Sequence, residues 1–182
     1  MAKALGMIEF KTVSAGIWAA DQMCKAADVE LIEAEVVCPG KYIALISGEL
    51  SAVRAAVDVA SNAKGDAFID NFVLGNPDPS IFPAIYGSSE IEGVDALGVL
   101  ETYDASAIIV AADLAAKTAD VKLIELRIAK GMCGKSYMLI TGEVAACEAA
   151  IERAKDEVGD RGMFLDSTVI ARPDAQMCRK IV

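Results

Sequence analysis

The sequence predicts an α/β chain of the α+β type, built from two tandem copies of one split β-α-β unit. Each copy is expected to form a mixed, mostly antiparallel sheet with two helices on one face, the ferredoxin-like arrangement. Three observations predict this: the halves of the chain repeat each other, each half alternates strand and helix patterns, and a stretch rich in proline and glycine joins them. We place the two domains at residues 1–91 and 92–182.

The internal repeat extends over most of the chain. At an offset of 92 positions, residues 4–37 and 96–129 share 17 identities in 34 pairs. At an offset of 94, residues 40–60 and 134–154 share 10 identities in 21 pairs. The second copy therefore gains two residues just after the position that matches Val37. Such agreement indicates a tandem duplication, so both halves are expected to contain the same elements.

The elements of the first half follow in the order β-α-β-β-α-β. The first helix is expected to begin at a Ser14 cap and to bury a stripe with helical spacing, namely Ile17, Ala20, Cys24 and Ala27. The second helix is expected after a Ser51 cap, with a buried stripe of Val53, Ala56, Val57 and Ala60. Apolar or alternating segments predict strands over residues 5–10, 31–37, 42–47 and 67–74.

Composition excludes several classes of function. The chain has 17 Lys and Arg against 27 Asp and Glu, no histidine and a formal charge of −10. Without histidine there is no Ser-His-Asp triad, no Cys-His pair and no imidazole metal ligand. The negative charge disfavours nucleic acid and anionic membrane surfaces as partners. No apolar run approaches the ~18 residues of a membrane span, and no signal peptide precedes the first strand, so we expect a cytoplasmic protein.

The five cysteines are odd in number and widely spaced, and none forms a C-x-x-C motif. This pattern argues against a disulfide framework and against a zinc ribbon. Cys24 and Cys147 fall on expected core stripes and are predicted to be small buried side chains, whereas Cys178 has no assignable role.

Several spaced blocks resemble the bacterial microcompartment (BMC) shell-protein domain in its unpermuted strand order. The blocks are A-L-G-M-I-E at residues 4–9, A-A-D-x-x-x-K-A-A-D-V at 19–29, G-K-Y at 40–42, S-G-E-L-S-A-V at 47–53 and V-I-A-R-P at 169–173. The resemblance implies a structural protein, not an enzyme, of two BMC domains. It also implies a homotrimer that imitates a hexamer and joins other shell proteins edge to edge in the microcompartment shell.

The same resemblance implies where neighbouring tiles meet and where the pore lies. Lys25, Lys117 and Arg172 match residues at tile edges, and the first half differs in having Asn76 where the second has Arg172. The loops between the second and third strands match the family's pore loops. In this chain the expected pore residues are Cys38, Pro39, Gly40 and Lys41 in the first half, and Gly131, Met132, Cys133, Gly134 and Lys135 in the second.

Cys38 gives the pore a candidate metal ligand. Three-fold symmetry would bring three thiolates to one axis, which suits three corners of an iron–sulfur cube. The C-P-G-K segment also resembles the iron–sulfur-binding tandem shell proteins of propanediol-utilisation microcompartments. This implies one [4Fe-4S] cluster per trimer, held by Cys38, electron transfer across the shell and a lumenal redox enzyme as partner. Lys41 or Lys135 could offset the cluster's charge, and Cys133 either assists or points away.

Three other functions remain as alternatives. The first is an enzyme with paired carboxylates, although pairs such as Glu9 and Glu101 repeat in both halves, which acid–base asymmetry does not need. The second is a small-molecule binding module, but Gly40 and Gly134 are isolated and form no phosphate-binding loop. The third is a tandem shell tile without a cluster, whose pore passes small metabolites.

Overall fold

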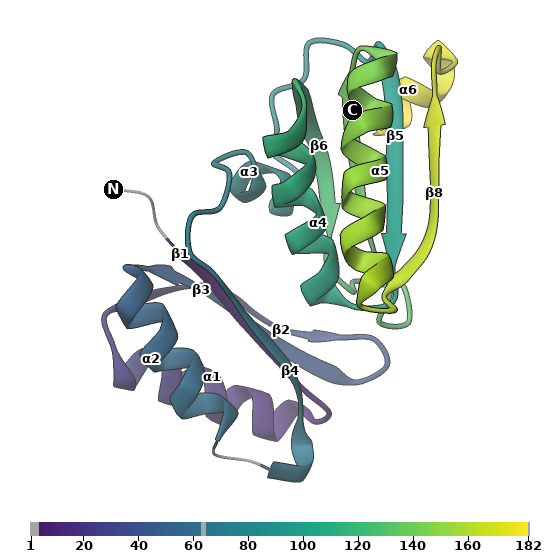
Figure 1. The fold of residues 1–182 in the computed structure, drawn as a ribbon. Coiled ribbons are helices and arrows are strands. Elements are labelled where there is room, and N and C mark those ends of the chain that lie inside the picture. Colours follow the sequence, from purple (N-terminus) through teal and green to yellow (C-terminus); the bar gives the residue numbers. More distant parts are fainter. Residues whose placement is uncertain (1–3, 63–64, 182) are drawn as a thin grey trace. The chain divides into compact units, whose positions relative to one another are not determined.

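A computed structural model describes residues 4–62 and 65–181 of the chain. Residues 1–3, which we considered above for a signal peptide, lie outside this range. The chain divides into two compact units between Pro77 and Asp78. Each unit contains a four-stranded sheet with a pair of long helices on one of its faces (Figure 1).

The first unit has the predicted order of elements, with a sheet ordered β2-β3-β1-β4 in which all neighbours are antiparallel. The two helices follow β1 and β3, so both crossovers lie on the same face, as in a split β-α-β unit. The elements are β1 Ala4–Phe10, α1 Val13–Ala26, β2 Val29–Val37, β3 Lys41–Gly48, α2 Leu50–Ser61, the short 3₁₀ turn Gly65–Ala67 and β4 Phe68–Leu74.

The core of the first unit lies between this sheet and its two helices. The predicted stripe of α2 is confirmed, because Val53, Ala56, Val57 and Ala60 are all buried. The predicted stripe of α1 is wrong in phase: Ile17 is 54% exposed and Cys24 is exposed. Of the predicted stripe only Ala20 is buried within α1, together with Ala15, Gly16, Ala19 and Met23.

The second unit repeats the sheet in the order β6-β7-β5-β8, again with antiparallel neighbours. A short helix follows the last strand of each repeat, α3 after β4 and α6 after β8, and α3 lies within the stretch that we expected to be an irregular linker. The elements are α3 Ile81–Ile85, β5 Ala96–Thr102, α4 Ala105–Thr118, β6 Val121–Arg127, β7 Ser136–Gly142, α5 Val144–Asp160, β8 Phe164–Ile170 and α6 Ala175–Ile181.

Both faces of the second sheet carry apolar contacts. Gly98 faces α5, since a Cβ there would lie 3.1 Å from Ile151, and its strand neighbours Leu97 and Val99 therefore point to the other face. On that other face a small cluster joins the sheet to the linker and to the C-terminal helix α6. Its members are Leu97, Ile124 and Leu139, with Ile91, Val94, Val99, Tyr137 and Ile181 packed against them.

The duplicated units pack one helix–strand contact in different ways. In the first unit Gly16 of α1 packs against Tyr42, and a Cβ at Gly16 would clash with three atoms of the Tyr42 side chain. The matching positions of the second unit hold Ile108, which is fully buried, and Ser136. A large side chain thus comes from the strand in one unit and from the helix in the other, which keeps the volume of the contact similar.

Candidate functional site

The turn between β2 and β3 presents Cys38. The Gly40 N–H donates to the carbonyl of Val37 at 2.9 Å, so residues 37–40 form a tight turn. The Cys38–Pro39 bond is cis, and Gly40 has a φ of +95°, a left-handed conformation that favours glycine. Pro39 and Gly40 are exposed and Cys38, a free thiol, is half-buried. The hairpin therefore holds Cys38 at its tip.

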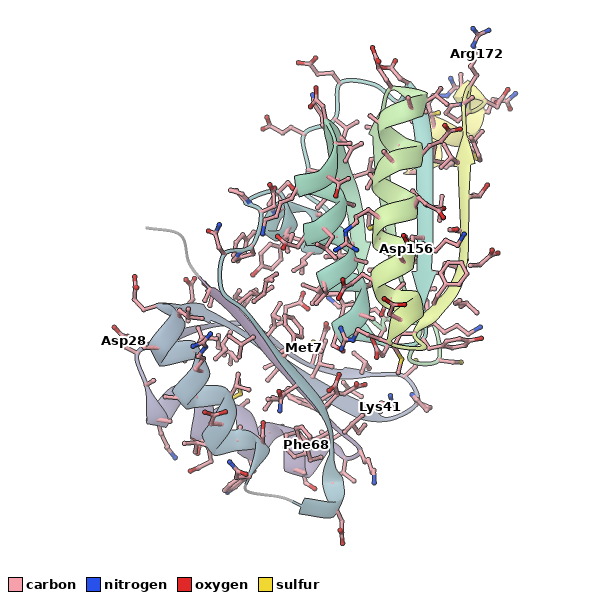
Figure 2. All side chains as sticks on the ribbon, viewed as in Figure 1. Met7, Asp28, Lys41, Phe68, Asp156 and Arg172 are labelled. Carbon is pink, nitrogen blue, oxygen red and sulfur yellow. The ribbon has the colours of Figure 1, made fainter. Side chains whose placement is uncertain are left out.

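An ion pair closes the base of this turn. Lys41, the first residue of β3 (labelled in Figure 2), pairs with Val37 across the hairpin. Its Nζ lies 3.0 Å from Glu9 Oε1. The Glu9 side chain is only 1% exposed, so its carboxylate needs a partner. The ammonium that we expected to offset the charge of a cluster is thus bound to a buried carboxylate of the same chain.

The second loop, residues 128–135, is longer and has a different backbone. Four of its residues have positive φ, and two of these, Ala129 at +53° and Cys133 at +55°, are not glycine. The Ala129 N–H donates to Ser136 Oγ at 3.0 Å, and the Lys135 N–H donates to the Met132 carbonyl at 3.1 Å. Cys133 and Lys135 are exposed. The loop thus presents its thiol on a strained backbone, because β-carbon-bearing residues rarely adopt this conformation.

A polar cluster that sequence reasoning missed lies beneath the second loop. Arg127 Nε donates to Glu125 Oε1 at 2.9 Å, and the Tyr137 hydroxyl donates to Glu125 Oε2 at 2.8 Å. Hydrogen bonding to Glu125 raises the pKa of Arg127, and burial, followed by the same carboxylate, raises the pKa of Tyr137. The cluster depends on the pairing of Arg127 with Tyr137 across β6 and β7, and this pairing could not be predicted from the sequence.

Among residues 4–62 and 65–181 of one chain, no group of three or more Cys, Asp or Glu side chains is placed so that it could hold a metal ion. Cys38 can bind a metal ion or cluster only with ligands from other molecules. Its sulfur is the soft donor that iron–sulfur clusters require. The donor chemistry therefore fits such a group, provided that several chains meet at Cys38.

The predicted edge residues lie on the surface and differ between the two units. Lys25 pairs with Asp21 at 2.5 Å, with side chains 67% and 48% exposed. Lys117 pairs with Asp113 at 2.7 Å, but Asp113 is only 6% exposed and also accepts the N–H of Asp78 at 2.8 Å. The two matched aspartates thus have different burial and partners.

Arg172 is exposed just after β8 and projects from the end of that strand (Figure 2). Its counterpart in the first unit, Asn76, is also exposed, just after β4. The difference between the two edges that we expected from the sequence therefore lies on the surface of both units.

The remaining cysteines are separate from the two turns. Cys147 is fully buried as predicted, and burial, followed by the charge of Asp95, raises the pKa of its thiol. The prediction for Cys24 is wrong, since it lies on the exposed side of α1. Cys178 is half-buried and its Sγ lies 3.9 Å from the Pro173 carbonyl.

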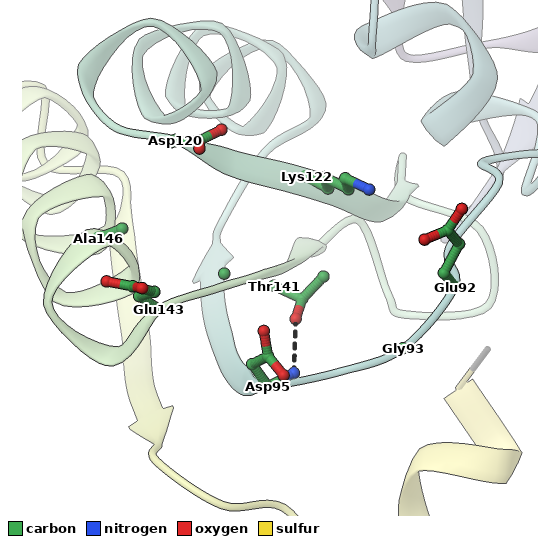
Figure 3. A pocket seen from close by; sticks show the side chains of 9 residues that line it. Glu92, Gly93, Asp95, Asp120, Lys122, Thr141, Glu143 and Ala146 are labelled. Atoms are coloured by element: carbon green, nitrogen blue, oxygen red, sulfur yellow. Dashed lines mark hydrogen bonds between the residues drawn. The ribbon is translucent and has the colours of Figure 1, made fainter.

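A pocket of about 640 Å³ lies in the second unit at the end of β7 that is far from the second loop (Figure 3). Inside it the Asp95 N–H donates to Thr141 Oγ1 at 3.2 Å. Four of the residues that line it carry carboxylates and one carries an ammonium, so the pocket is acidic. Its charged residues are Glu92, Asp95, Asp120, Glu143 and Lys122.

Comparison with known proteins gives a consistent family. The BMC domain family matches residues 4–77 and again residues 96–173. The chain is 35% identical to the bacterial microcompartment shell protein PduT of Citrobacter freundii over all of this chain and 99% of that protein. It is 28% identical to the carboxysome assembly protein CcmO of Synechococcus elongatus over 94% of this chain and 66% of that protein.

Solved structures agree. A microcompartment protein from Desulfitobacterium hafniense has a TM-score of 0.93 and 40% identity, covering 98% of this chain and 99% of that one. The fused permuted hexameric shell protein MSM0275 has a TM-score of 0.65 and 25% identity, covering 87% of this chain and 84% of that one. Across the part of the chain that the structure describes, no helix has the length and apolar character needed to span a bilayer.

Proposed function

The chain belongs to the BMC-domain family of bacterial microcompartment shell proteins, with one domain in each half, and we propose that it forms a trimeric tile with a redox-active central pore. Its place is the microcompartment shell, and its relatives are structural proteins. The observation that carries the proposal is Cys38, a free thiol at the tip of the β2–β3 hairpin, in the segment that corresponds to the family's pore loop.

Two domains per chain make a trimer the natural assembly, because three chains supply the six domains of a hexamer. The structural relative MSM0275 is described as a fused hexameric shell protein, which supports this count. In such a trimer the Cys38 turn and the Cys133 loop alternate around the axis. The lysines Lys25 and Lys117, with Arg172, are left at the outer edges, where they contact other shell proteins.

The assembly is tested by light scattering and electron microscopy. We expect a particle with the mass of three 19.1-kDa chains, which forms flat sheets at high concentration. The variants Lys25→Ala and Lys117→Ala keep the particle mass and lose the sheets. A stable monomer would overturn the trimer, and sheets that survive both substitutions would overturn the role of the edge lysines.

The donor set at the pore suits a [4Fe-4S] cluster, with one Cys38 thiolate from each chain at three of its corners. When bound, such a cluster supplies one-electron transfer between the two sides of the shell, for example to a lumenal redox enzyme. Lys41 remains bound to Glu9, whereas Lys135 makes no ion pair within the described ranges and can offset negative charge near the axis. Cys133, exposed in the neighbouring loop, is the second thiol within reach of the same axis.

The cluster is tested by the visible spectrum and the iron and sulfide content of anaerobically purified protein. We expect brown protein with about one cube per three chains, colourless Cys38→Ala and brown Cys133→Ala. Wild-type protein that stays colourless after reconstitution with iron and sulfide would support the other candidate, a tile whose pore passes small metabolites.

A further inference from the structure

Glu9 and Lys41 form an ion pair that the duplicated half does not reproduce. The second half contains the same residue types at the matching positions, Glu101 and Lys135. Neither of these two makes an ion pair in the parts of the chain that the structure describes. Identical side chains thus behave differently in the two units, and only the unit with the Cys38 turn forms the pair.

The strand register explains the difference. Glu9 of β1 faces Ile43 of β3, and Lys41, two residues earlier on β3, lies on the same face as a diagonal neighbour. In the second unit Glu101 faces Tyr137 in the same way. There β7 begins only at Ser136, so Lys135 lies in the loop and its side chain is exposed.

The other strand neighbour of each glutamate is the same in both units. Asp70 of β4 faces Glu9, and Asp166 of β8 faces Glu101. This neighbour therefore does not account for the difference. The extra pairing of Val37 with Lys41, which has no counterpart in the second hairpin, is what brings the ammonium to the buried carboxylate.

We propose that Glu9 is a positioning residue for Cys38: acting through Lys41, it anchors the turn to β1 and cancels the positive charge of the lysine that follows the thiol by three residues. Because Lys41 is paired with Glu9, the base of the turn that carries Cys38 is held to β1 by an ion pair whose two charges cancel. The loop that carries Cys133 is longer and has no matching ion pair, because Lys135 is not bound to Glu101 in the described parts of the chain. The proposal rests on the proposed role of Cys38 as the pore thiol.

The test compares alkylation of Cys38 by iodoacetate, an anion, with alkylation by iodoacetamide, which is neutral. The full-length protein is reduced and stripped of iron by a chelator, and labelling of each cysteine is followed by peptide mass spectrometry. The ratio of the two rates reports the local charge, because loosening of the turn or a change in thiol ionisation alters both rates alike. Cys133 is the internal reference and Glu101→Gln is the matched control.

Glu9→Gln leaves the Lys41 ammonium without its partner, so the iodoacetate to iodoacetamide ratio at Cys38 should rise about threefold. Lys41→Met removes the ammonium and keeps the Glu9 carboxylate, and the ratio should fall by about the same factor. The double variant removes both charges and should return the ratio to that of the wild type. Glu101→Gln should leave it unchanged.

The proposal would be overturned if the iodoacetate to iodoacetamide ratio at Cys38 were equal in the wild type and the variants while both absolute rates rose together. The Glu9–Lys41 pair would then only stabilise the sheet. Should one single variant fail to fold, the other single variant compared with the double variant gives the same answer. Since the measurement is made on iron-free protein, its failure is distinct from a failure to bind a cluster.

Discussion

In the first unit the hairpin of β2 and β3 stays paired out to Val37 and Lys41, whereas in the second the pairing of β6 and β7 stops at Arg127 and Tyr137. The first hairpin therefore needs only residues 38–40 to turn, and the second uses residues 128–135. A two-residue gain after the duplication thus converts a tight turn into an open loop. The same ancestral segment yields one anchored thiol and one strained, exposed thiol.

A chain with two BMC domains can therefore change one of its two hairpin loops while the register of the central strands stays the same. The β1–β3 and β5–β7 registers are the same through all seven pairs, from Ala4 and Ala96 onward. The pairing of the hairpin strands differs only toward the tip, where β2 and β3 stay paired to Val37 and Lys41. The strongest way to probe this comparison is to transplant a residue from one unit into its match in the other.

The largest effect is expected for Gly16→Ile, which places the second unit's Ile108 side chain into the first. The new side chain would collide with Tyr42, which is buried under the Cys38 hairpin, and we expect a loss of about 3 kcal/mol in the free energy of unfolding. Adding Tyr42→Ser, the residue type found at Ser136, should restore at least half of that loss. Urea unfolding at one fixed protein concentration measures both, and no recovery in the double variant would contradict the exchanged packing.

Asp113→Ala should cost about 2 kcal/mol, because this buried carboxylate accepts both the Lys117 ammonium and the Asp78 N–H. Its exposed counterpart gives the matched control: Asp21→Ala should cost less than about 0.5 kcal/mol. Thermal unfolding of the two variants side by side checks the difference. Equal losses would mean that burial and the contact to Asp78 contribute nothing.

Tyr137→Phe should cost about 1 kcal/mol at neutral pH through the lost hydrogen bond to Glu125. The raised pKa of Tyr137 means that its neutral form is favoured in the folded state. The stabilisation linked to this raised pKa is fully present below the ordinary pKa of 10, and it is lost as the pH rises through the higher pKa of the folded state. The variant should therefore lose less stability above pH 10 than the wild type, with the exposed Tyr103→Phe as an unchanged control in urea titrations.

The smallest effect is expected at the second loop, where Cys133→Gly relieves a positive φ and should stabilise the chain by about 0.5 kcal/mol. Gly40→Ala in the first turn has the opposite sign, a loss of about 1 kcal/mol, since Gly40 has a φ of +95°. Differential scanning calorimetry measures both shifts. A loss of stability in Cys133→Gly would show that the Cys133 side chain makes a contact that offsets the backbone strain.

Sequence patterns predicted the strands and the second helix because those segments bury one clear face. The stripe of Val53, Ala56, Val57 and Ala60 has helical spacing and contains two valines, and all four residues are buried. The phase of α1 was wrong because that helix is rich in alanine on several sides. Helical spacing alone could not distinguish Ile17 and Cys24 from the small residues that meet the sheet.

The candidate site was predictable in part. The resemblance to the family identified the two loops and Cys38, but the partner of Lys41 depends on which residues face each other across β1 and β3. Neither composition nor spacing contains that register. The cluster of Arg127, Glu125 and Tyr137 was not predicted for the same reason. The helix α3 was not predicted because the prolines and glycines around it indicated only a linker.

Native mass spectrometry of anaerobically purified protein tests the central claim most directly, because one spectrum counts both chains and clusters. The account predicts a single species of three chains that carries the added mass of one [4Fe-4S] cluster, and an intact trimer without that mass in Cys38→Ala. Trimers that gain no mass after reconstitution with iron and sulfide, or that lose the cluster only in Cys133→Ala, would contradict it.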